Sequence, residues 1–88
     1  MPNIQRIPVH DAFRALDYHN EWTGGNCQAW KKQVGNLVAY ISAEDATLGD
    51  TFDEEYGVSI EDHNDSLYTM TGSFAEVTEY AELHLKSR

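Results

Sequence analysis

WTGGNCQAWKKQVGNLVAYIS, residues Trp22–Ser42, holds the strongest local signal in the chain: two strand-like runs joined by Gly35-Asn36. A two-residue hairpin loop needs positive φ at one or both central positions, which glycine and asparagine tolerate best. This loop sets Val34 opposite Leu37. Because side chains alternate across a strand, we predict one apolar face directed towards the core. That face consists of Trp30, Val34, Leu37, Ala39 and Ile41, and it is interrupted by Lys32.

The segments beside this hairpin have their own signals. Residues 37–41 are apolar on both sides, which predicts a central position in the sheet. The paired glycines of Thr23-Gly-Gly-Asn26 predict a tight entry loop before the first strand. An anion cradle of backbone N–H groups is the alternative for these glycines, but the P-loop pattern is absent.

The remaining elements follow from periodicity. Apolar residues at helical spacing predict a short helix over about residues 9–18, with Trp22 packing where that helix meets the sheet. Alternation over residues 56–61 and a partner run over 66–71 predict a second hairpin with a turn at 62–65. Ser73 and Glu76 have the spacing of a capping box, which predicts a helix over about 74–86.

Together these elements predict one α+β domain over residues 1–88. The expected order is helix, hairpin, acidic loop, hairpin, helix. We expect a mostly antiparallel four-stranded sheet, covered on one face by the N-terminal and C-terminal helices.

Composition indicates a small soluble protein. The chain has 88 residues and 41% hydrophobic content, which is typical of one folded domain. One cysteine excludes an internal disulfide, and neither a secretory h-region nor a stretch of transmembrane length is present. We therefore expect a cytoplasmic protein.

Charge is distributed unevenly along the chain. The net charge is −9, and residues 33–85 contain no lysine or arginine but twelve of the fifteen acidic residues. This argues against binding to nucleic acid or to anionic membranes, and it permits a protein partner with a basic surface. The simpler alternative is that the acidic residues serve solubility.

The densest carboxylates form the candidate partner-binding set. If they line one face, they could imitate the phosphates of DNA, and the protein would then be a DNA mimic. The rival contact is a hydrophobic docking patch around Trp22 or Tyr40. The nine acidic candidates are Glu44, Asp45, Asp50, Asp53, Glu54, Glu55, Glu61, Asp62 and Asp65.

Catalytic and metal-binding chemistry find little support in the sequence. Cys27 is the one possible thiol nucleophile, but the four histidines are scattered and match no local signature. A cysteine at the start of a strand more often packs than reacts, so we expect Cys27 to be structural. The acidic turn at residues 62–65 lacks the spacing of a calcium loop, and no Cys/His set has zinc spacing. We expect neither a metal nor a cofactor.

Residues 22–48, with the run Trp-Thr-Gly-Gly-x-Cys-x-Ala-Trp, a hairpin and then Ile-Ser-Ala-Glu-Asp-Ala-Thr-Leu, resemble small uncharacterised proteins of actinobacteria and their phages. Asn26 stands where those proteins usually have a third glycine. The resemblance implies a phage or mobile-element context and no particular mechanism.

We therefore predict a small acidic, non-catalytic protein that binds a protein partner, with a homo-oligomer as an open alternative. A DNA-mimic inhibitor of a host protein, of anti-restriction or anti-CRISPR type, is the second hypothesis. A cysteine-dependent enzyme is the third.

Overall fold

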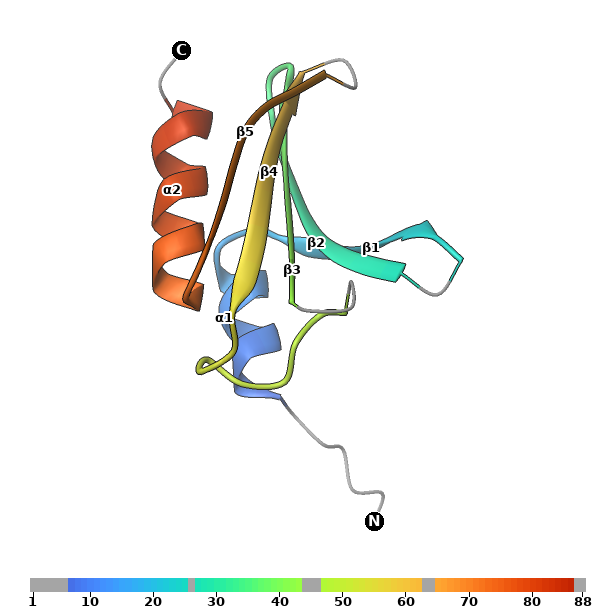
Figure 1. The fold of residues 1–88 in the computed structure, drawn as a ribbon, viewed down its shortest axis with the longest axis vertical. Helices are drawn as coiled ribbons and strands as arrows, with labels where there is room; N and C mark the ends of the chain where they lie inside the picture. Colours follow the sequence, from blue (N-terminus) through green and yellow to red (C-terminus); the bar gives the residue numbers. More distant parts are fainter. Residues whose placement is uncertain (1–6, 26, 44–46, 63–64, 87–88) are drawn as a thin grey trace.

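A computed structural model of the chain describes residues 7–25, 27–43, 47–62 and 65–86. These residues form α1 (Pro8–Ala15), β1 (His19–Gly24), β2 (Cys27–Val34), β3 (Leu37–Ala43), β4 (Tyr56–Asp62), β5 (Asp65–Gly72) and α2 (Phe74–Lys86). The strands make one antiparallel sheet in the order β1-β2-β3-β4-β5, so each strand pairs with the next one in the chain (Figure 1). Both described helices are too short and polar to cross a bilayer.

The expectation of four strands is wrong, because the sheet has five. The additional strand is β1, which pairs with β2 from His19↔Lys31 to Gly24↔Cys27. Its sequence, HNEWTG, lacks apolar alternation, and an edge strand of this kind does not need it since neither face is fully buried. Gly25 has φ +53°, as Gly35 has +61° in the next hairpin. Of the two glycines predicted to form an entry loop, Gly24 therefore ends β1 and Gly25 lies in the hairpin turn.

The register predicted from Gly35-Asn36 is confirmed. Val34 pairs with Leu37, and Trp30 pairs with Ile41. The strand predicted to be central, β3, is the middle one of five. Trp30 and Ile41 are fully buried, whereas Val34 is 39% exposed because it lies at the hairpin end.

Helix α1 ends earlier than predicted. A Schellman motif closes it: the Tyr18 N–H donates to the Phe13 carbonyl, and the Asp17 N–H donates to the Arg14 carbonyl, each at 3.0 Å. Asp17 takes the left-handed conformation at φ +73°, which aspartate tolerates better than most residues. The chain turns there, so residues 19–24 are free to form β1.

Both helices pack on the same face of the sheet, as predicted. The Phe13 ring of α1 stacks on Trp30 of β2, with ring centroids 4.9 Å apart. It also meets Tyr56 of β4 and Phe74 of α2 at 5.8 and 4.8 Å. Trp22, predicted to fill this junction, is instead 61% exposed, and Trp30 takes the place.

Lys32 lies on the helix-covered face without leaving a buried charge unpaired. Its ammonium forms an ion pair with Glu82 of α2 at 2.5 Å, and it sits 5.5 Å from the centre of the Tyr18 ring. The interruption in the apolar face therefore marks the point where α2 crosses β2.

Helix α2 begins as predicted, with a capping box. The Ser73 N–H donates to Glu76 Oε1 at 2.8 Å, and the Glu76 N–H donates to Ser73 Oγ at 3.2 Å. The helix spans Phe74–Lys86, and its buried side includes Val77, Ala81 and Leu85.

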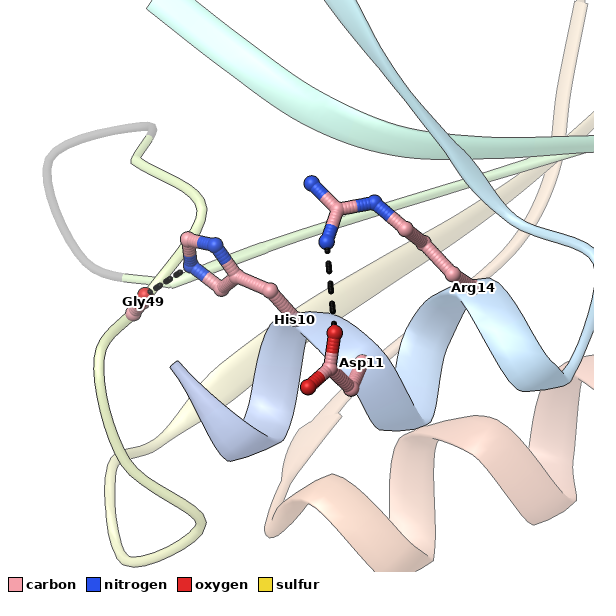
Figure 2. A network of polar contacts seen from close by, with 4 residues as sticks. All are labelled: His10, Asp11, Arg14 and Gly49. Carbon is pink, nitrogen blue, oxygen red and sulfur yellow. Dashed lines mark hydrogen bonds and ion pairs between the residues drawn. The ribbon is translucent and has the colours of Figure 1, made fainter. Parts of the chain in front are cut away.

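The acidic connection between β3 and β4 is tied to the body of the domain. His10 Nε2 of α1 donates a hydrogen bond to the Gly49 carbonyl at 2.7 Å (Figure 2). Within the same helix, Asp11 and Arg14 form an ion pair at 3.6 Å. The indole of Trp30 donates to the Leu48 carbonyl at 3.1 Å. The Tyr56 hydroxyl donates to the Thr51 carbonyl at 2.6 Å.

Replacing the central ring should have the largest effect on stability. Phe13→Ala should lower the free energy of unfolding by about 3–5 kcal/mol, because a fully buried ring leaves a cavity. Phe52→Ala, at a ring that is 45% exposed, is the matched control and should cost clearly less. Urea denaturation measures both. Equal losses would contradict the central role of Phe13.

The capping box should contribute a smaller, separable amount. Ser73→Ala should cost about 1 kcal/mol through loss of the N-cap, whereas Glu79→Gln on the exposed side of the same helix should cost almost nothing. The double variant Ser73→Ala/Glu76→Ala should cost less than the sum of the single changes, because the two bonds are reciprocal. Full additivity would contradict a shared box.

Tyr56 should make stability fall at high pH. Burial, with smaller contributions from the charges of Glu54 and Asp50, raises the pKa of Tyr56 from 10.0 to about 12. The folded state therefore holds the phenol proton more tightly than the unfolded state. The resulting stability is complete below pH 10 and is lost as pH rises through 12.

Thermal unfolding followed between these pH values should thus show a decline that is smaller in Tyr56→Phe. Tyrosinate absorbance at equilibrium is the independent readout. An identical decline in the variant would show that Tyr56 is not responsible.

Candidate functional site

One face of the sheet carries no helix from the part of the chain that the structure describes, and we call it the open face (Figure 1). Its side chains alternate with the buried ones along β3, β4 and β5. Most of them bear hydroxyl or carboxylate groups, so this face is polar where the opposite face is apolar. The open face consists of Val38, Tyr40, Ser42, Gly57, Ser59, Glu61, Thr69 and Thr71.

A cavity of about 480 Å³ lies at the β1–β2 side of this face. Figure 1 shows the β1–β2 hairpin projecting away from the other strands. Four strands contribute to the cavity, which joins a second hollow of about 520 Å³ over β4 and β5 through Tyr40 and Ser42. The lining residues are Glu21, Trp22, Gln28, Ala29, Tyr40, Ser42 and Glu61.

The cavity combines exposed aromatic surface with carboxylates. Trp22 is 61% exposed and Tyr40 is half-buried, and both line the cavity. The Tyr40 ring already accepts a cation from its own chain, because Lys31 Nζ lies 5.9 Å from the ring centre. Glu61 accepts a hydrogen bond from Ser59 Oγ at 3.2 Å, and Glu21 lies 3.5 Å from His19 Nε2. Aromatic faces and carboxylates both favour a positively charged ligand.

The seven acidic candidates that the structure describes do not form one ridge. Asp50, Asp53, Glu54 and Glu55 precede β4, whereas Glu61, Asp62 and Asp65 lie at its other end and in β5. The length of β4 separates the two groups by about 20 Å. Glu44 and Asp45 lie outside the described residues. Among the seven described candidates, only Glu61 lines the cavity.

Glu54 has a structural role in the first group. Its carboxylate accepts hydrogen bonds from the backbone N–H groups of Asp50 and Thr51, at 2.6 and 3.1 Å. Neutralising Glu54 would therefore change the shape of the loop as well as its charge, which makes it a poor probe of partner binding.

Cys27 is exposed, contrary to the expectation that it packs. It begins β2 and pairs with Gly24 across a hairpin end, where no core is available to cover it. Cys27 lies four residues before Lys31 on β2, and Lys31 pairs with His19. Cys27 and His19 are therefore about 13 Å apart along the hairpin. His10 and His84 instead contact Gly49 and the Tyr68 ring. His63 lies outside the described residues.

Sequence reasoning missed Glu21 and Gln28 as parts of this site. Both depend on β1, which brings residues 21 and 22 beside β2 and, through it, towards β3. The signal that could have found them is the second Gly-Asn dipeptide, Gly25-Asn26, which repeats the dipeptide of the predicted hairpin. Among the binding hypotheses, Trp22 and Tyr40 belonged to the hydrophobic rival of electrostatic binding. The cavity brings them together with a carboxylate from the acidic set.

Within the described ranges, no three side chains of histidine, cysteine, aspartate or glutamate gather in a way that could hold a metal ion. Comparison with protein-family models gives no match, and neither the curated proteins nor the solved structures searched match the chain.

Proposed function

We propose that this chain is a small non-catalytic binding protein. It recognises a basic surface of a protein partner by taking an arginine or lysine side chain into the open-face cavity. The single observation that carries the proposal is that two aromatic residues and two glutamates line one hollow: Trp22, Tyr40, Glu21 and Glu61.

The chemistry of the lining favours a guanidinium group. A carboxylate can receive two parallel hydrogen bonds from the planar guanidinium, and an aromatic face can stack on it. The amide of Gln28 and the hydroxyl of Ser42 add neutral hydrogen-bonding groups to the same lining. A volume of about 480 Å³ falls in the range usual for ligand pockets.

Electrostatics of the whole chain act in the same direction. A net charge of −9 attracts basic partners at long range and speeds their encounter with the protein. The acidic groups at the two ends of β4 contribute to this attraction without needing to touch the partner. The contact itself then rests on the cavity, where aromatic surface adds affinity that salt does not screen.

The geometry favours the other two hypotheses less. Imitation of DNA needs a continuous line of charge, about one per 1.7 Å of duplex axis. The seven described acidic candidates instead lie in two separate groups, at the two ends of β4. A cysteine enzyme needs a base beside its thiol. His10 and His84 contact other parts of the fold, and His19 lies about 13 Å along the hairpin from Cys27.

The proposal is tested with matched tripeptides. Acetyl-Gly-Arg-Gly-amide should bind in the millimolar range and shift the indole N–H resonance of Trp22, whereas the neutral isostere with citrulline should not. Glu61→Gln should weaken the arginine peptide by about threefold, the size expected of a partly exposed ion pair. Trp22→Ala should weaken it further, and Lys31→Gln should strengthen it by removing a competing cation.

Glu79→Gln is the control for net charge, since it removes one carboxylate on α2, away from the cavity. It should leave peptide affinity within error of the unchanged protein. Equal affinity for the arginine and citrulline peptides would refute the proposal. If Glu61→Gln and Glu79→Gln lose the same affinity for the arginine peptide, the peptide binds by non-specific charge attraction and not in the cavity.

A further inference from the structure

Strand β5 leaves one edge of the sheet without a strand partner among the described residues. Such an edge presents unpaired backbone groups, and proteins usually protect it with lysine, proline or a bulge. β5 has the sequence DSLYTMTG, with neither lysine nor proline. The register shift against β4 lies near its start, opposite Ile60/Glu61, so the part from Tyr68 to Gly72 is regular. This part can accept another strand.

An apolar groove runs beside that edge. It has a volume of about 340 Å³ and is lined by Met70 of β5 and by Glu76, Glu79, Tyr80 and Leu83 of α2. Leu83 is 64% exposed, the largest exposed fraction among the described large apolar side chains. Leu67 and Tyr68, both 46% exposed, continue the apolar surface along β5. Tyr68 is held in place by His84, whose ring stacks on it at 4.1 Å.

The outer stripe of α2 has an order of charge that complements itself. Residues three or four apart lie on one side of a helix, which groups Glu76, Glu79, Tyr80, Leu83 and Lys86. The acidic residues lie at the start of this stripe, the apolar ones in the middle, and the lysine at the end. A second helix running in the opposite direction would set its Lys86 beside Glu76 and its Leu83 beside Tyr80.

We propose that the occupant of this edge is a second copy of the chain. The two copies pair antiparallel through β5, around a two-fold axis perpendicular to the sheet, and form one sheet of ten strands. Because α2 follows β5 directly and packs against it, the two α2 helices then lie antiparallel on the same face. This isologous contact uses the same surface on both copies, and it leaves the open-face cavity uncovered.

A basic foreign segment fits this surface less well than a second copy. The groove offers its two carboxylates, Glu76 and Glu79, at one end of the α2 stripe. The lysine at the far end of the stripe would repel a uniformly basic partner. In an antiparallel second copy, the lysine end of one α2 stripe lies beside the glutamate end of the other, so opposite charges meet at both ends.

Sedimentation equilibrium of the full chain tests the proposal. At about 0.15 M salt the Debye length is about 8 Å, which screens repulsion between distant charges and spares contact pairs. The mass should rise from monomer towards dimer between about 10 µM and about 1 mM. Leu83→Glu, which places a carboxylate against the apolar centre and Glu79 of the other copy, should raise the dissociation constant on the order of tenfold or more. Lys86→Glu should act in the same direction.

Val34→Glu is the matched control, because it introduces the same charge at an exposed apolar residue of the β2–β3 hairpin. It should leave the dissociation constant unchanged. Hydrogen exchange adds a readout of the strand pairing. Alternate amides of Tyr68–Gly72 should be protected in the dimer and exchange rapidly in Leu83→Glu, whose fold is checked by circular dichroism.

A chain that stays monomeric at about 1 mM would overturn the proposal. A dimer that survives both Leu83→Glu and Lys86→Glu would overturn it as well, because its contact would lie elsewhere. Glu61→Gln should not alter the dimer, so the outcome is independent of arginine binding at the cavity.

Discussion

The stacking of Phe13 on Trp30 is the contact on which the rest of the structure depends. The ring of Phe13 reaches two strands and the other helix, through Trp30, Tyr56 and Phe74. Trp30 in turn holds the β3–β4 connection by its bond to the Leu48 carbonyl. A domain of 88 residues buries a limited apolar area, so a few large rings supply much of its core. The two helices therefore gather on one face of the sheet, around one aromatic junction.

This one-sided packing decides where binding surfaces can occur. The two helices cover the apolar face of the sheet. The opposite face therefore carries hydroxyl, carboxylate and aromatic side chains at alternate positions. The β1–β2 hairpin extends beyond the area covered by the helices, and the hollow between it and β3 forms the cavity. At the other side of the sheet, α2 covers β5 incompletely, and Leu83 remains largely exposed. The two proposed contacts thus lie on opposite margins of one sheet, and each can be altered without the other.

The acidic residues show how charge in a sequence divides between roles. Glu82 compensates Lys32 where α2 crosses β2, Glu76 caps α2, and Glu54 shapes the β3–β4 connection. These carboxylates serve the fold. Glu21 and Glu61 line the cavity, and Glu79 lines the groove beside β5. A count of acidic residues could not separate these functions, because each depends on what lies beside the carboxylate.

The sequence by itself determined the local elements whose signals depend on neighbours along the chain. The Gly35-Asn36 hairpin, the central position of β3, the second hairpin and the capping box of α2 all follow from turn chemistry, alternation and short spacing. The helical stripe predicted α1, although its end was misjudged because the left-handed Asp17 carries no strong compositional signal.

Only the tertiary structure decided the features that depend on pairing at a distance. β1 has no apolar alternation, because it is an edge strand that is partnered on one side alone, and its sequence could not reveal it. The exposure of Trp22 and Cys27 follows from their place on that hairpin, beyond the cover of the helices. The cavity joins residues 21, 22, 28, 40 and 61, which four strands bring together. Burial and proximity of this kind arise from the order of strands in the sheet, which local periodicity does not encode.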